Sequence, residues 1–117
     1  MSPQERRLEN RLQVNLPARC SSDAAALDGW IANVSRTGVF LRSQYLDVMG
    51  AEVDLVFDLP GERLPIAVRG RVVRVSEQVM CPGMGIRFTA VSDGARHRLA
   101  NFMARRARGR GASQAEL

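Results

Sequence analysis

The 117-residue sequence contains no lysine, and all of its 17 basic residues are arginines. The absence of lysine excludes a phosphate-binding loop of the kind whose glycine-rich turn ends in a lysine. Arginine forms planar, bidentate hydrogen bonds with phosphates and with the edge of guanine, so this composition suits a nucleotide ligand. A GC-rich coding sequence is the simpler explanation for most of these arginines.

Cysteine and histidine are also scarce, with two cysteines and one histidine in the chain. Cys20, Cys81 and His97 cannot supply the four ligands of a structural zinc site. We therefore expect no metal and no cofactor, and we expect both cysteines to be buried as small apolar side chains. Because no apolar run approaches about 20 residues, and residues 1–18 lack the apolar stretch of a signal peptide, we predict a cytoplasmic protein.

The hydrophobic pattern has the period of two that is typical of half-buried strands. A chain of this length forms one domain. Six short strands in succession predict a small antiparallel β-barrel, followed by a helix that Ser92 caps and then by a disordered tail. The expected strands are 13–20, 30–35, 38–43, 52–59, 64–77 and 83–91, the expected helix is 92–106, and the expected tail is 107–117.

Two positions of this pattern bear on a binding site. Trp30 could offer a stacking surface to a guanine base, but its alternation with Ala32 and Val34 favours packing of the indole in the core. By the same alternation, Asn33 and Ser35 should point away from the core, side by side. In the fifth strand the alternation slips near Gly70 and at residues 72–73, which indicates a bulge.

Two polar motifs stand out from the strands. The first, residues 7–11 (Arg-Leu-Glu-Asn-Arg), places Arg7 and Arg11 four residues apart before the first strand. The second, residues 33–38 (Asn-Val-Ser-Arg-Thr-Gly), combines an amide, a hydroxyl and a glycine at a turn. Gly38 permits a positive φ or a close approach of ligand or backbone. Arg69, Arg71 and Arg74 share a strand and could line the same face, although solvated strand charges are the simpler interpretation.

These motifs resemble the signature of the PilZ domain, a bacterial receptor module for cyclic di-GMP: RxxxR followed by [D/N]xSxxG. The similarity extends over residues 5–106 and includes the late segment 83–88 (Gly-Met-Gly-Ile-Arg-Phe). It implies a PilZ-like domain over 1–106, with a ligand-binding arm at 1–12, a barrel at 13–91 and a helix at 92–106. It also implies a set of cyclic di-GMP-binding residues, namely Arg6, Arg7, Arg11, Asn33, Ser35 and Gly38.

Within this resemblance, Arg7 and Arg11 would hold guanine edges and phosphates, and the ligand would order the arm. Arg6 corresponds to a family position associated with an intercalated dimer of cyclic di-GMP. Asparagine at position 33 should bind somewhat more weakly than aspartate, since its hydrogen bond to guanine is not charge-assisted.

Three function classes follow. The first is a non-catalytic cyclic di-GMP receptor that signals by contact with an unidentified effector protein. The second is a PilZ-like adaptor that binds proteins without ligand. The third is a nucleic-acid-binding barrel, suggested by the arginine cluster at 105–110 but opposed by an aromatic content of 5%. An enzyme is disfavoured because the sequence offers no credible carboxylate pair and no metal cluster.

Overall fold

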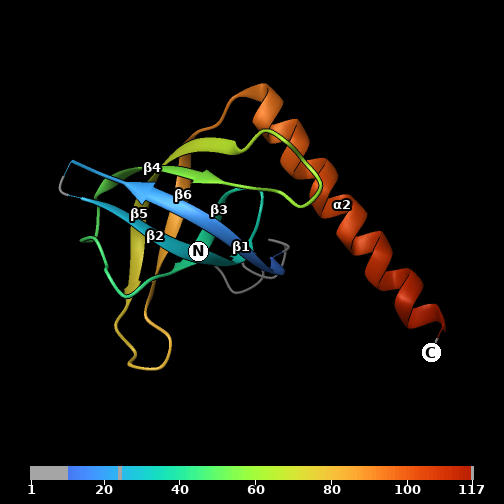
Figure 1. Ribbon diagram of the computed structural model, residues 1–117, viewed down its shortest axis with the longest axis horizontal. Helices are drawn as coiled ribbons and strands as arrows, with labels where there is room; N and C mark the ends of the chain where they lie inside the picture. Colours follow the sequence, from blue (N-terminus) through green and yellow to red (C-terminus); the bar gives the residue numbers. More distant parts are fainter. Residues whose placement is uncertain (1–10, 24, 117) are drawn as a thin grey trace, which may run out of the picture.

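A computed structural model describes residues 11–23 and 25–116, and the side chains of 109–116 are outside the description. The described residues form six strands and one long helix (Figure 1). The elements are β1 (Leu12–Ser21), β2 (Ala26–Val34), β3 (Gly38–Arg42), β4 (Glu52–Phe57), β5 (Ile66–Ser76), β6 (Gly83–Ala90) and α2 (Asp93–Glu116).

The six strands close into an antiparallel barrel in the order β1-β2-β3-β6-β5-β4, which confirms the predicted fold class. Inward side chains alternate along the strands as expected, for example Val53, Leu55 and Phe57 on β4. The interior is a single apolar cluster that includes Ile31 and Leu41. Closure pairs each strand with a neighbour on both sides, and apolar side chains fill the interior. A ligand that binds between the strand ends must therefore lie on the outer wall.

The predicted irregularity of β5 is confirmed. Its register against β6 shifts between Arg69 and Gly70 and again between Val72 and Arg74. At Gly70 a side chain would collide with Ile86, because an added Cβ would lie 2.6 Å from the Ile86 side chain. Glycine and the two bulges together let β5 bend around the barrel.

A bulge in β2 changes the face of Trp30. The pairing of β2 with β3 steps from Ile31↔Leu41 directly to Asn33↔Phe40, so Ala32 is an extra residue. Trp30 therefore points outward while Ile31 is fully buried, and the prediction that Trp30 packs in the core is wrong. The alternation of Trp30, Ala32 and Val34 assumed a regular strand, and one inserted residue reverses that phase.

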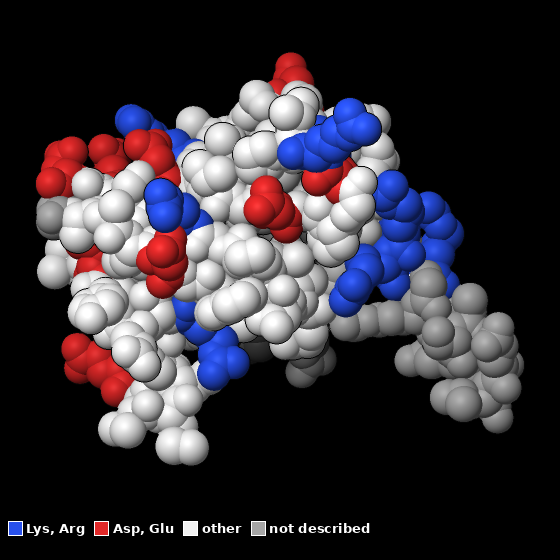
Figure 2. Space-filling view, viewed as in Figure 1, with Lys and Arg blue, Asp and Glu red and all other residues white. Residues whose placement is uncertain are grey.

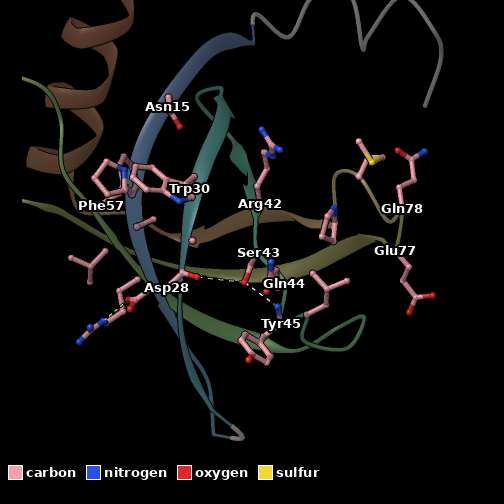
Figure 3. A pocket seen from close by; sticks show the side chains of 18 of the residues that line it. Asn15, Asp28, Trp30, Arg42, Ser43, Gln44, Tyr45, Phe57, Glu77 and Gln78 are labelled. Atoms are coloured by element: carbon pink, nitrogen blue, oxygen red, sulfur yellow. Dashed lines mark hydrogen bonds and ion pairs between the residues drawn. The ribbon is translucent and has the colours of Figure 1, made fainter.

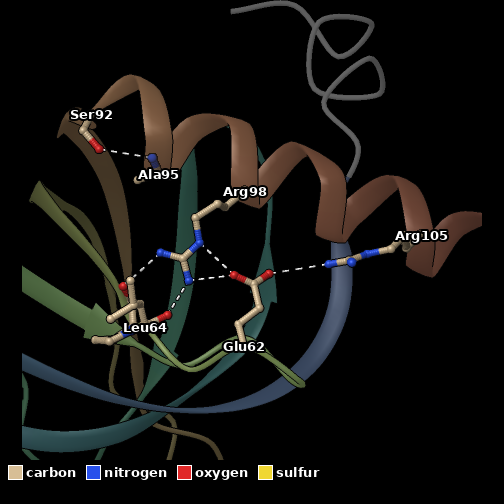
Figure 4. Close-up of polar contacts among 7 residues, drawn as sticks. Glu62, Leu64, Ser92, Ala95, Arg98 and Arg105 are labelled. Carbon is tan, nitrogen blue, oxygen red and sulfur yellow. Dashed lines mark hydrogen bonds and ion pairs between the residues drawn. The ribbon is translucent and has the colours of Figure 1, made fainter.

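The helix begins as the sequence predicts, with Ser92 as its N-cap. The Ala95 amide donates to Ser92 Oγ at 3.1 Å, and the apolar contacts of the helix come from Ala95, Leu99 and Phe102. Glu62, in the turn after β4, accepts from Arg98 Nε at 2.7 Å and lies 3.5 Å from the Arg105 guanidinium (Figure 4). Arg98 also donates to the Leu64 carbonyl. These contacts fix the first half of α2 against the barrel.

The helix continues to Glu116, past the predicted end at residue 106 and into the segment 107–117 for which the sequence predicted a disordered tail. The expectation rested on the glycines and small residues of this segment and on the loss of apolar periodicity. Periodicity reports what a helix packs against, and the alanines and arginines of the segment favour helix without any packing partner, whereas Gly109 and Gly111 oppose it. In Figure 1 this second half of α2 extends away from the barrel. No helix within the described residues is long and apolar enough to cross a membrane.

Candidate ligand-binding site

The second motif forms the turn between β2 and β3, and Ser35 holds that turn together. Its Oγ accepts from the amides of Thr37 and Gly38, each at 3.2 Å, and its own amide donates to the Gly38 carbonyl at 2.8 Å. Ser35 is fully buried, so the expectation that it points outward beside Asn33 is wrong. The strand ends at Val34, and the turn rather than the strand period sets the direction of Ser35.

Gly38 is needed for a close backbone approach rather than for a positive φ. A Cβ at this position would collide with the Ile86 carbonyl oxygen across the β3–β6 ladder. The sequence allowed Gly38 either a positive φ or a close approach, and the structure shows a close approach of backbone.

The two motifs meet at Arg11 and Asn33. Arg11 Nε donates to Asn33 Oδ1 at 2.7 Å, although the residues are 22 apart in the sequence. The pairing Gln13↔Asn33 between β1 and β2 brings them together. The hydrogen bond fixes the orientation of an exposed guanidinium against an amide on the barrel wall. Arg6 and Arg7 lie outside the described residues, as does most of the predicted arm at 1–12.

A continuous row of residues leads from Asn33 across the outer wall. Asn33 pairs with Phe40, Phe40 with Gly85, and Gly85 with Arg74. The Arg74 guanidinium lies over the Phe40 ring, 5.7 Å from its centroid. Gly85, which has no side chain, leaves room for Arg74, because an added Cβ would lie 3.3 Å from Arg74 Cβ. The row thus carries an amide, an aromatic ring and a cation on four adjacent strands.

The neighbouring arginines of β5 have structural partners. Arg69 Nε lies 3.1 Å from Asp54 Oδ1, and Arg71 lies 3.2 Å from Glu52. Hydrogen bonding to Asp54 raises the pKa of Arg69. Both pairs are cross-strand contacts between β4 and β5 that are more than half exposed, so Arg69 and Arg71 are solvated strand charges. Arg74 differs because it stacks on Phe40.

A large hollow of about 1500 Å³ lies on the outer wall, and its lining includes Trp30, three residues before Asn33 (Figure 3). Asn15, Trp30 and Arg42 project into it from β1, β2 and β3. On the opposite side it is bounded by the loop between β5 and β6, including Gln78. Sequence reasoning missed this hollow because the phase of Trp30 was assigned without the bulge in β2. Gln78 also lines a smaller hollow of about 460 Å³ over Phe40 and Arg74.

Charge is distributed unevenly over the visible face (Figure 2). Arginines gather along α2, whereas acidic residues are prominent at the far end of the barrel. Cys20 is buried and Cys81 partly buried, and both are free thiols. Burial, followed by the carboxylates of Asp47 and Asp54, raises the pKa of the Cys20 thiol to about 11. Over the described residues, no group of three or more His, Cys, Asp and Glu side chains could hold a metal ion.

These features define a closed antiparallel barrel whose outer wall carries a paired arginine and asparagine. The family model of the PilZ domain matches residues 5–105. The chain therefore belongs to the PilZ domain family. A comparison with curated proteins finds no match.

Solved structures with this fold include proteins from several bacteria. The inhibitor of motility MotI/DgrA of Bacillus subtilis is 19% identical, with a TM-score of 0.77 over 93% of this chain and 57% of that one. The PilZ domain of YcgR from Escherichia coli, solved with c-di-GMP, is 14% identical, with a TM-score of 0.74 over 96% and 99%. The c-di-GMP complex of Borreliella burgdorferi PlzA is 19% identical, with a TM-score of 0.60 over 85% and 41%. This chain thus spans little more than half of the Bacillus protein.

Proposed function

We propose that this protein is a cyclic di-GMP receptor whose ligand binds at the junction of the two motifs. The observation that carries the proposal is the 2.7 Å hydrogen bond between Arg11 and Asn33, which joins the RxxxR segment to the [D/N]xSxxG turn. The fold is that of PilZ domains, and the YcgR domain and PlzA were solved with this ligand.

The chemistry of the junction fits a guanine nucleotide. An arginine fork can donate two hydrogen bonds to guanine O6 and N7, and its charge attracts the phosphodiesters. Asn33 offers both an acceptor and donors beside that fork. Ser35 and Gly38 serve the ligand indirectly, because they hold the turn that presents Asn33.

The proposal includes how the signal is transmitted. Cyclic di-GMP orders the arm of residues 1–12 against the barrel, with Arg7 and Arg11 as its contacts. Arg6 favours an intercalated ligand dimer. The ordered arm then presents a new surface to an effector protein in the cytoplasm, and the receptor itself catalyses no reaction.

Isothermal titration of cyclic di-GMP into the protein tests this function. Arg7→Ala and Arg11→Ala should each weaken binding roughly five- to 150-fold, as expected for a lost arginine–guanine contact. Arg96→Ala is the matched control, since it removes an exposed arginine on α2, a helix that contacts the barrel chiefly through β5. A stoichiometry of two ligands per protein supports the dimer, and a value near one contradicts it.

Two results would contradict the receptor. If the wild type takes up no cyclic di-GMP, the ligand-independent adaptor becomes the better assignment. If DNA or RNA binds with a steep salt dependence and cyclic di-GMP does not compete, the nucleic-acid-binding barrel is favoured.

A further inference from the structure

Trp30 is a large apolar side chain that lies exposed on the outer wall of the barrel instead of in the core. Its side chain is 52% exposed, while the next residue, Ile31, is fully buried. Leaving half of an indole in water forgoes a substantial part of the free energy that burying an aromatic side chain provides. The bulge at Ala32 keeps Trp30 outside, so this exposure is built into the backbone of β2.

The same bulge places Trp30 and Asn33 on one face. In a regular strand, residues three apart point to opposite faces. Here Asn33 pairs with Phe40 and Trp30 pairs with Arg42, and Phe40 and Arg42 are two apart on β3. The two rungs are therefore roughly 7 Å apart along the strand, at about 3.4 Å per residue. The Arg11–Asn33 junction and Trp30 lie within the span of one dinucleotide.

Polar groups flank the indole on both neighbouring strands. Asn15 on β1 and Arg42 on β3 line the same hollow of about 1500 Å³ (Figure 3). Within the described residues, Arg42 forms no ion pair, unlike Arg19, Arg69 and Arg71 on the same barrel. An exposed aromatic face beside an uncommitted guanidinium is the arrangement with which proteins hold an unpaired base.

We propose that Trp30, with Arg42 beside it, is a second base-binding platform, on which another guanine of the bound cyclic dinucleotide stacks. Arg42 donates to the O6 and N7 edge of that guanine or to its phosphate. The platform extends the ligand footprint from the motif junction along β2 and β3, and it distinguishes ligands with two purines from those with one. This inference rests on the proposed function.

Trp30 is the single tryptophan of the chain, so its fluorescence reports on the platform directly. Cyclic di-GMP should quench the Trp30 emission and protect the indole from quenching by acrylamide. The fluorescence change should saturate at the ligand concentration that calorimetry gives for the same sample. Trp30→Ala should weaken binding measured by calorimetry roughly five- to 150-fold, the range found for single base–aromatic stacks. Trp30→Phe should recover part of that loss, since a phenyl ring keeps a stacking face.

Matched variants separate stacking from other effects. Arg42→Ala should weaken binding, and Arg96→Ala, which removes the same charge from α2, should not. Tyr45→Ala removes another exposed aromatic side chain of the hollow, farther along the chain from the motif, and should leave affinity unchanged. Circular dichroism melting of each variant verifies that the barrel is intact.

The results distinguish this inference from the receptor itself. The platform would be overturned, and the receptor would stand, if calorimetry detects binding while the wild-type emission is unchanged and Trp30→Ala binds with wild-type affinity. Quenching without any loss of affinity in Trp30→Ala would also overturn it, because emission can respond to a nearby arm without stacking. Absence of calorimetric binding would overturn both.

Discussion

The side chain of Asn33 should influence the affinity of the proposed site for cyclic di-GMP. It departs from the more acidic option of the family signature, and its Oδ1 accepts from Arg11 Nε at 2.7 Å. Asn33→Asp would replace a neutral acceptor with a charged one, which strengthens hydrogen bonds to guanine N1 and N2. We expect cyclic di-GMP affinity to rise several-fold, measured by calorimetry. A lower affinity would indicate that the variant ties Arg11 to the new carboxylate and withholds it from the ligand.

Ser35 is predicted to affect stability more than binding chemistry. Ser35→Ala removes the acceptor for two backbone amides in a fully buried turn. We expect the free energy of unfolding to fall by roughly 1–3 kcal/mol, the cost of leaving buried polar groups without partners. Urea denaturation measures this change. Arg36→Ala, an exposed substitution in the same turn, is the control, and equal melting of Ser35→Ala and wild type would contradict the structural role.

The two cysteines should differ sharply in reactivity. The pKa of the Cys20 thiol is raised from 9.0 to about 11, chiefly by burial, whereas Cys81 is partly exposed. At pH 8 one thiol per native molecule should react quickly with Ellman's reagent, and Cys81→Ser should abolish that fast phase. Two thiols reacting at similar rates would contradict the burial of Cys20.

The raised pKa also makes stability depend on pH. The unfolded chain loses the Cys20 proton near pH 9, and the folded chain keeps it until about pH 11. The folded state therefore loses stability as pH rises between these values and is unaffected below them. Denaturation at pH 8 and pH 10.5 should show a larger decrease for wild type than for Cys20→Ala. Equal decreases would show that Cys20 contributes no such dependence.

At the level of elements, the strand pattern predicted the barrel well because inward positions alternate on most strands. Residues such as Val53, Leu55 and Ile86 needed only the period of two to be placed. The errors occurred where the backbone breaks that period. Ala32 is inserted in β2 and reversed the assignment of Trp30, and the turn after Val34 redirected Ser35. Bulges and turns depend on pairing with distant strands, which a single sequence does not display.

The candidate site could be predicted from the sequence only as a set of residues. Arg11 and Asn33 were both expected there, and the structure brings them into contact through the β1–β2 pairing. Arg74 was one of three arginines considered for this face, but its contact with Phe40 and the outward direction of Trp30 depend on the cross-strand register, which a single sequence does not display. Arg6 and Arg7 stay predictions, since they lie outside the described residues.

The attachment of α2 depends on Glu62. This carboxylate and the Arg98 guanidinium are both less than a third exposed, and the pair is held at 2.6 Å (Figure 4). Glu62→Ala should destabilise the fold by roughly 1.5–2 kcal/mol, the lower part of the range for hydrogen bonds to charged groups, because Arg98 would lose its carboxylate partner. A double-mutant cycle with Arg98→Ala measures the coupling between the two side chains. A coupling energy near zero between Glu62 and Arg98 would contradict this account. Arg105→Ala is the control: this arginine is more exposed, so its loss should change stability little.

For the molecule as a whole, the structure separates a compact barrel from a helical extension. Among the described side chains, α2 packs against the core through Ala95, Leu99, Phe102 and Met103. All four precede residues 107–116, which form the extension. Arginines gather along α2 in Figure 2, and the sequence of this helix includes Arg105, Arg106 and Arg108. The proposed ligand site uses the opposite end of the chain together with β1, β2 and β3. Ligand binding and the extension should therefore be separable.

A variant ending at Arg106 tests that separation. Because it keeps the apolar contacts of α2 and the Glu62–Arg98 pair, it should fold with a melting temperature close to that of the full chain. Its affinity for cyclic di-GMP and the quenching of Trp30 should be unchanged. Any binding to an acidic surface should weaken only in part, because the variant loses Arg108 and Arg110 but keeps Arg105 and Arg106. If the shortened chain loses cyclic di-GMP affinity at constant stability, the extension takes part in the ligand site, and the receptor cannot be reduced to barrel and arm.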